Sequence, residues 1–201
     1  MCYTPSEQGN RCRKTEKRAM PPDLDIYGLT KHRDTATINR FLDTYVDRAK
    51  SWDRGDEELM MEPLPLTHPE TGEESAEWES TPFEWEPALT LSHIIERGLA
   101  SPRRAFTVSL APKRVDLTSV ILSFTADDQL ILGVAIDDEG AKPENERRAK
   151  ELLVQLVEAY ACHMGLILVE EYPPRSEMAF YARAKKPLAV FFSTFPEKPV
   201  P

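Results

Sequence analysis

Residues 119–169, SVILSFTADDQLILGVAIDDEGAKPENERRAKELLVQLVEAYACHMGLILV, carry the clearest structural pattern of the chain. They contain three dense apolar runs, Ser119–Thr125, Leu130–Ile136 and Leu166–Val169, each as long as a typical buried strand. The first two runs are separated by residues 126–129 (ADDQ), whose aspartates favour a hairpin turn. A segment of helical period precedes the third run. The order therefore predicts strand, turn, strand, helix and strand.

The helix of this stretch has recognisable ends and one apolar side. Pro143 suits its first position, and Glu144 and Glu146 suit the first turn, where the helix dipole is positive. Gly165 is the expected stop at the C-terminal end. The spacing of three and four residues predicts one buried stripe of Ala149, Leu152, Leu153, Leu156, Val157, Tyr160 and Met164.

A strand and a second helix are expected near the start of the chain. Asp23–Thr30 (DLDIYGLT) alternates apolar and polar residues as a short strand does. Asp34 is a suitable N-cap for the helix that follows. The same helical spacing predicts a buried stripe of Ile38, Phe41, Leu42, Tyr45, Val46 and Ala49.

Three further patterns lie between and after these elements. Leu89–Leu99 predicts a short helix that ends at Gly98. Ala105–Leu110 alternates between apolar and hydroxyl side chains, which is typical of a half-buried strand. The apolar runs Met178–Ala182 and Leu188–Phe195 are interpreted as a further hairpin.

Consecutive antiparallel strands flanked by helices predict an α+β fold. We expect a mixed, mostly antiparallel sheet, with two main helices packed on one face and a long acidic loop. A single domain is expected over residues 23–195, with the loop at 52–88 and a short tail at 196–201. Residues 1–22 are either a flexible basic tail or, up to Met20, an untranslated segment preceding the true start.

Charge and composition narrow the class of partner. The 201 residues carry a formal net charge of −9, with a sequence pI near 5.1. This charge opposes nucleic-acid binding, because phosphate backbones are polyanionic, and it suits a basic protein partner. No apolar run reaches about 18 residues, so no membrane span or membrane partner is predicted. Three cysteines without regular spacing favour a reducing, cytoplasmic compartment over a disulfide framework.

The stretch from Trp52 to Pro87 combines twelve carboxylates with three tryptophans and only one arginine. Tryptophan is enriched among the residues that anchor protein interfaces, and carboxylates attract a cationic partner over a long range. The alternative is that the aromatic residues cover an exposed sheet face while the acids keep the loop in water. The candidate partner-binding residues are Trp78, Trp85, Phe83, Glu73, Glu74, Glu77 and Glu79.

A second acidic group follows two of the predicted strands. If Leu130–Ile136 and Leu166–Val169 run in the same direction, Asp137, Asp138, Glu170 and Glu171 reach one edge of the sheet. Clustered carboxylates are ligands for Mg²⁺ or Ca²⁺, and sites in such sheets favour the carboxyl ends of strands. The alternative is that the strands simply end where charged, solvated residues begin.

No motif in the chain identifies a reaction. Zinc-ligand spacing, a Gly-x-Ser-x-Gly elbow and a glycine-rich phosphate loop are all missing from the sequence. We therefore expect a non-enzymatic, acidic, cytoplasmic protein-binding domain without a cofactor, for example an immunity-type or antitoxin-type protein that occludes a basic partner. The alternatives are a hydrolase that depends on divalent metal held by the second acidic group, and a homo-oligomer built through exposed sheet edges.

Overall fold

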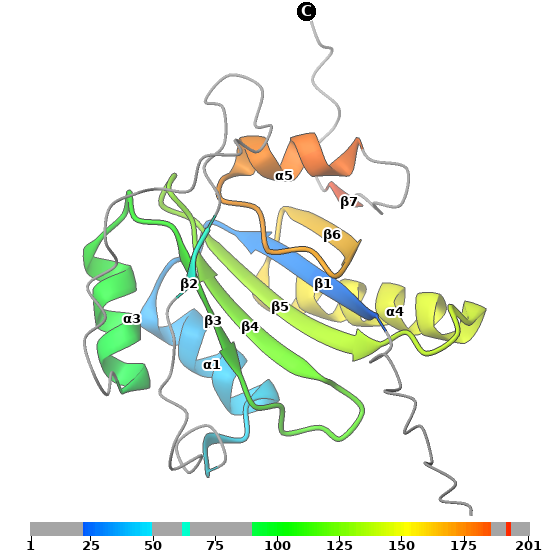
Figure 1. Ribbon diagram of the computed structural model, residues 1–201. Helices are drawn as coiled ribbons and strands as arrows, with labels where there is room; N and C mark the ends of the chain where they lie inside the picture. Colours follow the sequence, from blue (N-terminus) through cyan, green and yellow to red (C-terminus); the bar gives the residue numbers. More distant parts are fainter. Residues whose placement is uncertain (1–21, 50–61, 65–89, 186–191, 194–201) are drawn as a thin grey trace, which may run out of the picture.

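The computed structural model describes residues 22–49, 62–64, 90–185 and 192–193 (Figure 1). These residues form an antiparallel sheet with the strand order β2-β3-β4-β5-β1-β6-β7. Its strands are β1 (Asp23–Thr30), β2 (Glu62–Pro63), β3 (Phe106–Leu110), β4 (Ser119–Phe124), β5 (Leu130–Asp137), β6 (Met164–Val169) and β7 (Phe192–Ser193).

The central strand is the first one in the sequence. β1 pairs antiparallel with β5 on one side and with β6 on the other, so β5 and β6 run in the same direction without touching. All other neighbouring pairs of described strands are antiparallel as well. The α+β prediction is confirmed, and described strands run parallel only across an intervening antiparallel strand, as β5 and β6 do across β1.

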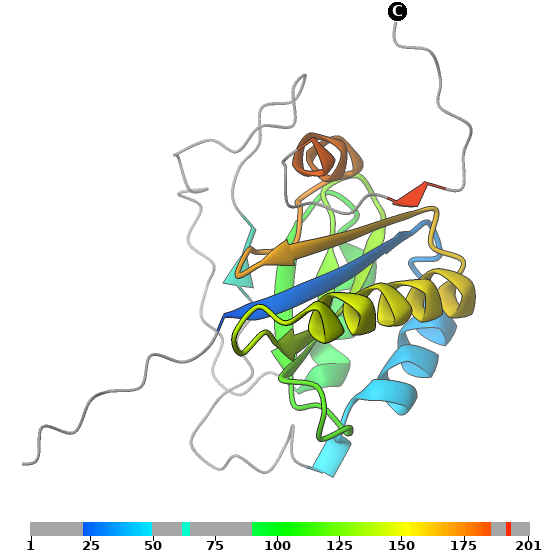
Figure 2. The same cartoon turned by 90° about the vertical axis from the view of Figure 1, so that its right-hand side faces the viewer.

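Helices cover the two faces of the sheet unequally. The helices are α1 (Thr35–Tyr45), α3 (Leu91–Ala100), α4 (Pro143–Tyr160) and α5 (Glu177–Ala184). The first three pack with Leu24 and Ile26 on one face, which we call the helix-covered face. α5 packs with Tyr27 and Leu29 on the opposite side, the second face. Figure 2 shows α5 above the sheet and α1 and α4 below it.

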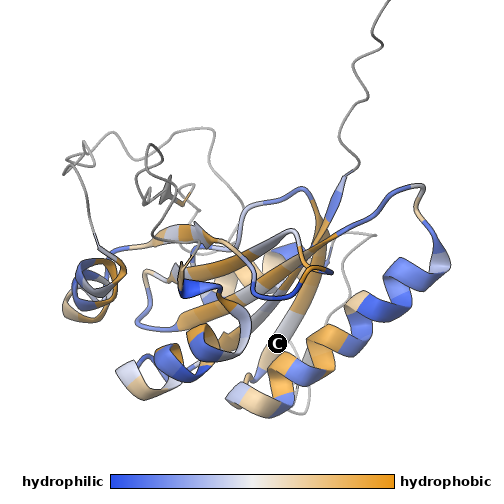
Figure 3. Cartoon of the chain, turned by 90° about the horizontal axis from the view of Figure 1, so that it is seen from below, coloured by the Kyte–Doolittle hydropathy of each residue, from blue (hydrophilic) through white to orange (hydrophobic). Residues whose placement is uncertain are grey.

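The main core lies under the helix-covered face. The predicted α4 stripe is buried from Ala149 to Tyr160, and the α1 stripe is buried from Ile38 to Val46. Met164, which the helical spacing assigned to the α4 stripe, lies in β6 instead and packs on the second face. Ala49 is exposed, because α1 ends at Tyr45 and Val46 forms an extended bridge to Pro112. Figure 3 shows apolar colour along the strands and alternating colours along α4. None of the helices in the described ranges is long and apolar enough to cross a membrane.

Two predicted helix ends are wrong for the same reason. Ala161, with a φ of 50°, caps α4, while Gly165 lies inside β6. A Cβ at Gly165 would lie 2.6 Å from Cδ1 of Leu153, so this glycine allows α4 to approach the sheet. Gly98 lies within α3, against the ring of Phe124. Both glycines serve close packing rather than helix termination.

The predicted C-terminal hairpin is also wrong. Residues 177–184 form the helix α5, whose N-cap Ser176 accepts a hydrogen bond from the amide of Ala179. Short apolar runs do not distinguish a strand from a helix, and here Ser176 and the buried Phe180 favour the helix. Of the second run, Phe192 and Ser193 are described, and they pair with β6.

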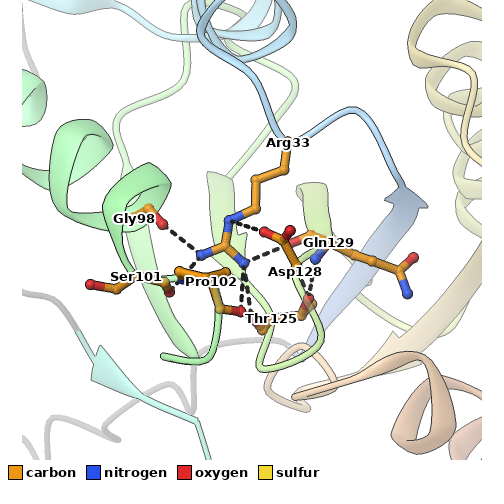
Figure 4. A network of polar contacts seen from close by, with 7 residues as sticks. All are labelled: Arg33, Gly98, Ser101, Pro102, Thr125, Asp128 and Gln129. Carbon is orange, nitrogen blue, oxygen red and sulfur yellow. Dashed lines mark hydrogen bonds and ion pairs between the residues drawn. The ribbon is translucent and has the colours of Figure 1, made fainter.

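A buried arginine joins three loops at one end of the sheet (Figure 4). The Arg33 side chain is only 3% exposed and donates hydrogen bonds to the carbonyl oxygens of Gly98, Ser101 and Thr125. Its guanidinium also lies over the ring of Phe124. Arg33 therefore ties the β1–α1 loop to the end of α3 and to the β4–β5 turn.

Candidate functional site

A polar pocket of about 340 Å³ lies on the part of the second face beyond α5. Its floor comes from the ends of β1, β3, β4 and β5, and the segment after β6 forms one wall. The lining residues are Asp23, Asp25, Tyr27, Thr107, Ser109, Ser119, Ile121, Ala135, Glu170, Glu171, Tyr172 and Pro173.

The strand register explains why the sheet is hollow here. Asp25 pairs with Ala135, and Ala135 pairs with Ser119 on the next strand. These small side chains leave a depression beside the carboxyl group. In the neighbouring row a Cβ at Gly133 would lie 2.7 Å from Cδ1 of Tyr27, so the missing side chain leaves room for the Tyr27 ring. The pocket is thus shaped by small residues on adjacent strands.

Glu171 is the most firmly held residue of the wall. Its amide donates a hydrogen bond of 3.1 Å to Oδ2 of Asp25, and its carbonyl accepts one of 2.9 Å from the hydroxyl of Tyr27. Its carboxylate forms an ion pair with the buried Arg183 of α5. The preceding residue, Glu170, has a φ of 49°, which turns the chain away from β6. The wall is therefore fixed to both β1 and α5.

The electrostatics of the pocket centre on Asp25. The pKa of Asp25 is raised to about 7, mainly by burial and in addition by the carboxylates of Asp23, Glu170 and Glu171, against the lowering effect of the Glu171 amide. At neutral pH the Asp25 carboxyl therefore exchanges a proton readily. Burial also raises the pKa of Tyr27 well above its usual value, so Tyr27 remains a hydrogen-bond donor.

The second acidic group from the sequence is partly brought together. β5 and β6 both end beside Asp23, which pairs with Asp137 and accepts a hydrogen bond at its carbonyl from the amide of Glu170. Glu170 and Glu171 line the pocket, whereas Asp137 and Asp138 lie outside it.

The outer pair of aspartates makes local contacts. Asp137 accepts a hydrogen bond of 2.7 Å from the amide of Glu139, and Asp138 accepts one of 3.1 Å from the side chain of Asn145. Among the described residues, no group of three or more histidine, cysteine, aspartate or glutamate side chains is arranged to hold a metal ion.

The acidic loop, residues 52–88, lies outside the described residues except for 62–64, and so do the tails at 1–21 and 196–201. The candidate partner-binding residues of the loop, which are Trp78, Trp85, Phe83, Glu73, Glu74, Glu77 and Glu79, all fall in the part of the chain that is not described.

Asp25, at the centre of the pocket, is not among the candidate residues predicted from the sequence. Asp23 and Asp25 alternate with the buried Leu24 and Ile26 in the first strand, which assigns both carboxylates to the face opposite the core. That alternation is a signal that sequence reasoning could have used. The two strands that supply serine and threonine hydroxyl groups, β3 and β4, offered no comparable signal, because these residues are common on exposed sheet faces.

Cys162 is a second titratable group that lies apart from the pocket. It is buried beneath α4, and burial raises its thiol pKa to about 12. A thiol of that pKa is a poor nucleophile, since the reactive form is the thiolate. Cys162 is therefore a packing residue.

Comparisons with protein-family models, curated proteins and solved structures find no match to this chain.

Proposed function

We propose that this protein is a non-enzymatic binding protein whose second-face pocket accepts a cationic group from a basic protein partner. The observation that carries the proposal is the position of Asp25, which lies within a pocket and whose charged neighbours that raise its pKa are all carboxylates. A partner ammonium or guanidinium group placed there would neutralise this repulsion.

The shape of the pocket suits the end of one long side chain. Its volume is near the lower limit of the range for small-ligand sites. Tyr172 is 49% exposed at the rim and offers an aromatic surface to a lysine or arginine stem. Ser109 and Ser119 supply hydroxyl groups on the floor that can accept hydrogen bonds from the cationic head.

The sequence supports the same class of partner. A net charge of −9 and the acidic Trp52–Pro87 stretch would accelerate the approach of a basic protein. An immunity-type or antitoxin-type protein, which covers a basic effector, is the specific form that we propose.

The proposal is tested with capped tripeptides followed by NMR chemical shifts. Acetyl-Gly-Lys-Gly-amide and acetyl-Gly-Arg-Gly-amide should shift the amide signals of Asp25, Ser119 and Tyr172, and acetyl-Gly-Gln-Gly-amide should not. Glu170→Gln should weaken the effect, whereas Asp137→Asn removes a charge outside the pocket and should preserve it. Equal shifts from the lysine and glutamine peptides would reject the proposal.

The competing proposal is a hydrolase that depends on Mg²⁺ or Ca²⁺. Its basis is that β5 and β6 bring four candidate metal ligands to one edge of the sheet, which are Asp137, Asp138, Glu170 and Glu171. Metal titration separates the two functions. A metalloenzyme should melt at a higher temperature when either ion is added, because the ion binds only the folded state. A binding protein should show no such increase.

A further inference from the structure

We infer that the second-face pocket selects a primary ammonium group, such as the end of a lysine side chain, over the guanidinium group of arginine. This selectivity rests on the proposed binding function and specifies the chemical class of the cation. It follows from the hydrogen bonds that the pocket carboxylates already accept inside the protein.

Asp25, at the centre of the pocket, has one oxygen left for a ligand. Its Oδ2 accepts a hydrogen bond of 3.1 Å from the amide of Glu171, and no other described residue donates to this carboxyl group. The donor belongs to the backbone of the wall, whose carbonyl is in turn held by the hydroxyl of Tyr27. The bond to Oδ2 is therefore part of the fold, and Oδ1 is the acceptor that faces no internal donor.

Asp23 repeats this arrangement two residues earlier on β1. It lies on the same face as Asp25, since both alternate with the core residues Leu24 and Ile26. Its Oδ2 accepts a hydrogen bond of 3.1 Å from the hydroxyl of Thr118, with no second donor from the described part of the chain. Two residues of a strand span about 7 Å, so the pocket offers two single oxygens from separate carboxylates.

The two glutamates of the wall do not change this pattern. The carboxylate of Glu171 forms an ion pair with Arg183, whose side chain is only 5% exposed. An internal guanidinium thus already occupies the place that an arginine from a partner would take. Glu170 is exposed at the rim, where ion pairs contribute little because water competes for both charges.

Single oxygens from separate groups suit an ammonium. Its three N–H donors point in different directions, so they can reach Asp23, Asp25 and a serine hydroxyl of the floor, Ser109 or Ser119. A guanidinium gains most when both oxygens of one carboxylate face its planar fork. An ammonium loses more hydration than a guanidinium, but the three acceptors replace the water that it loses.

The experiment measures dissociation constants of three capped peptides for the full chain by calorimetry at pH 8. These are acetyl-Gly-Lys-Gly-amide, acetyl-Gly-Arg-Gly-amide and the lysine peptide with a trimethylated Nζ. We expect the lysine peptide to bind about tenfold more tightly than the arginine peptide, which corresponds to one charge-assisted hydrogen bond. The trimethylated peptide keeps the charge but has no N–H donor, so it should also bind about tenfold more weakly.

Two threonine variants assign the preference to the held oxygens. Thr118→Val removes the hydroxyl that engages Oδ2 of Asp23, so that both oxygens of this carboxylate can face a guanidinium fork. The ratio of the two dissociation constants should then move from about tenfold toward equality. Thr44→Val removes a hydroxyl of α1 that lies outside the pocket, and it should keep the wild-type ratio.

The outcomes separate the ammonium selectivity from the proposed function. Equal or tighter binding of the arginine peptide, or undiminished binding of the trimethylated peptide, overturns the selectivity and leaves a cation-binding pocket. A ratio that is unchanged in Thr118→Val overturns the role of the held oxygens and the inference with it. No binding of any of the three peptides overturns the binding function as well.

Discussion

At the scale of single residues, Asp25 and Arg33 show two different uses of a buried charge. Both terminal nitrogens of the Arg33 guanidinium donate hydrogen bonds to carbonyl oxygens, and its Nε lies 3.6 Å from Oδ1 of Asp128. Asp25 accepts one backbone amide and otherwise has carboxylates nearby. The first charge stabilises the fold, whereas the second costs free energy when it is ionised. Carboxyl groups with strongly perturbed pKa values cluster at functional sites.

Asp25→Asn should raise stability in a pH-dependent way. Because the folded-state pKa of Asp25 is raised above its usual value, the folded protein holds a proton that the unfolded chain loses between about pH 4 and pH 7. Relative to wild type, the variant should gain little at pH 4 and progressively more up to pH 7, by at most about 4 kcal/mol.

Urea unfolding of both proteins across this range measures that difference. If the difference in free energy of unfolding were the same at pH 4 and pH 8, the Asp25 carboxyl would have an ordinary pKa in the folded protein.

Arg33→Lys should destabilise the protein although the charge is kept. A lysine lacks the planar fork, so some of the carbonyls of Gly98, Ser101 and Thr125 lose their buried donor. The expected cost is on the order of 2–4 kcal/mol. Arg147→Lys, at a side chain that is 75% exposed, is the control and should change stability by less than about 0.5 kcal/mol. Thermal or urea unfolding is the measurement, and equal effects of the two variants would mean that Arg33 joins the loops only weakly.

At the scale of elements, α4 and α5 differ in how strongly their sequences specify them. α4 begins with Pro143, has two acidic residues in its first turn and presents one continuous buried stripe. α5 has eight residues and a single large apolar side chain that is buried, Phe180. Because isolated short helices are marginal, α5 depends on its packing against the second face. Arg183 of α5 forms an ion pair with Glu171, so the packing of α5 also holds the pocket wall in place.

Leu156→Ala in α4 should cost on the order of 2–5 kcal/mol, since Leu156 is fully buried and the deletion leaves a cavity. Val154→Ala provides a control on the outer side of the same helix, where the side chain is 43% exposed. Its cost should stay within about 0.5 kcal/mol. Urea unfolding compares the two variants, and a small cost for Leu156→Ala would mean that the stripe is not the packed face.

At the scale of the whole molecule, one face of the sheet carries the main core and the other carries the pocket. Three helices seal the helix-covered face around the main core, whereas α5 covers only part of the second face. The remainder of that face holds the pocket and its carboxylates. A sheet with one sealed face can carry polar residues on the other without weakening the core.

The acidic stretch should contribute to binding in two separable ways. Neutralising Glu73, Glu74, Glu77 and Glu79 to glutamine should mainly lower the association rate for a basic partner, because long-range attraction is screened by salt. Trp85→Ala should mainly raise the dissociation rate through loss of apolar burial. Surface-plasmon measurements at two salt concentrations, with a basic protein recovered by affinity capture, test both effects. Unchanged rates in a protein that lacks residues 67–84 would show that the stretch only shields the surface.

Local sequence patterns were sufficient to predict most of the helices and strands. The first strand, the β4–β5 hairpin and the buried stripe of α4 follow from alternation, turn residues and helical spacing, all of which act between near neighbours in the chain. The α+β class followed from the order of these elements. The helix α5 was missed because a short apolar run has no decisive period, and its cap carried the signal instead.

The sequence by itself therefore determined most of the strands and helices, which of their sides are apolar, and that the chain is acidic. Only the tertiary structure decided that β1 lies between β5 and β6, and this placement brings Asp25 beside Glu170 and Glu171. The same placement packs the ring of Tyr27 against Gly133 of β5. The physical reason is that the order of strands in a sheet depends on how the whole sheet buries its apolar face, which no local pattern specifies. In the same way, the pKa of a carboxyl group depends on charges that are distant in sequence but close in space.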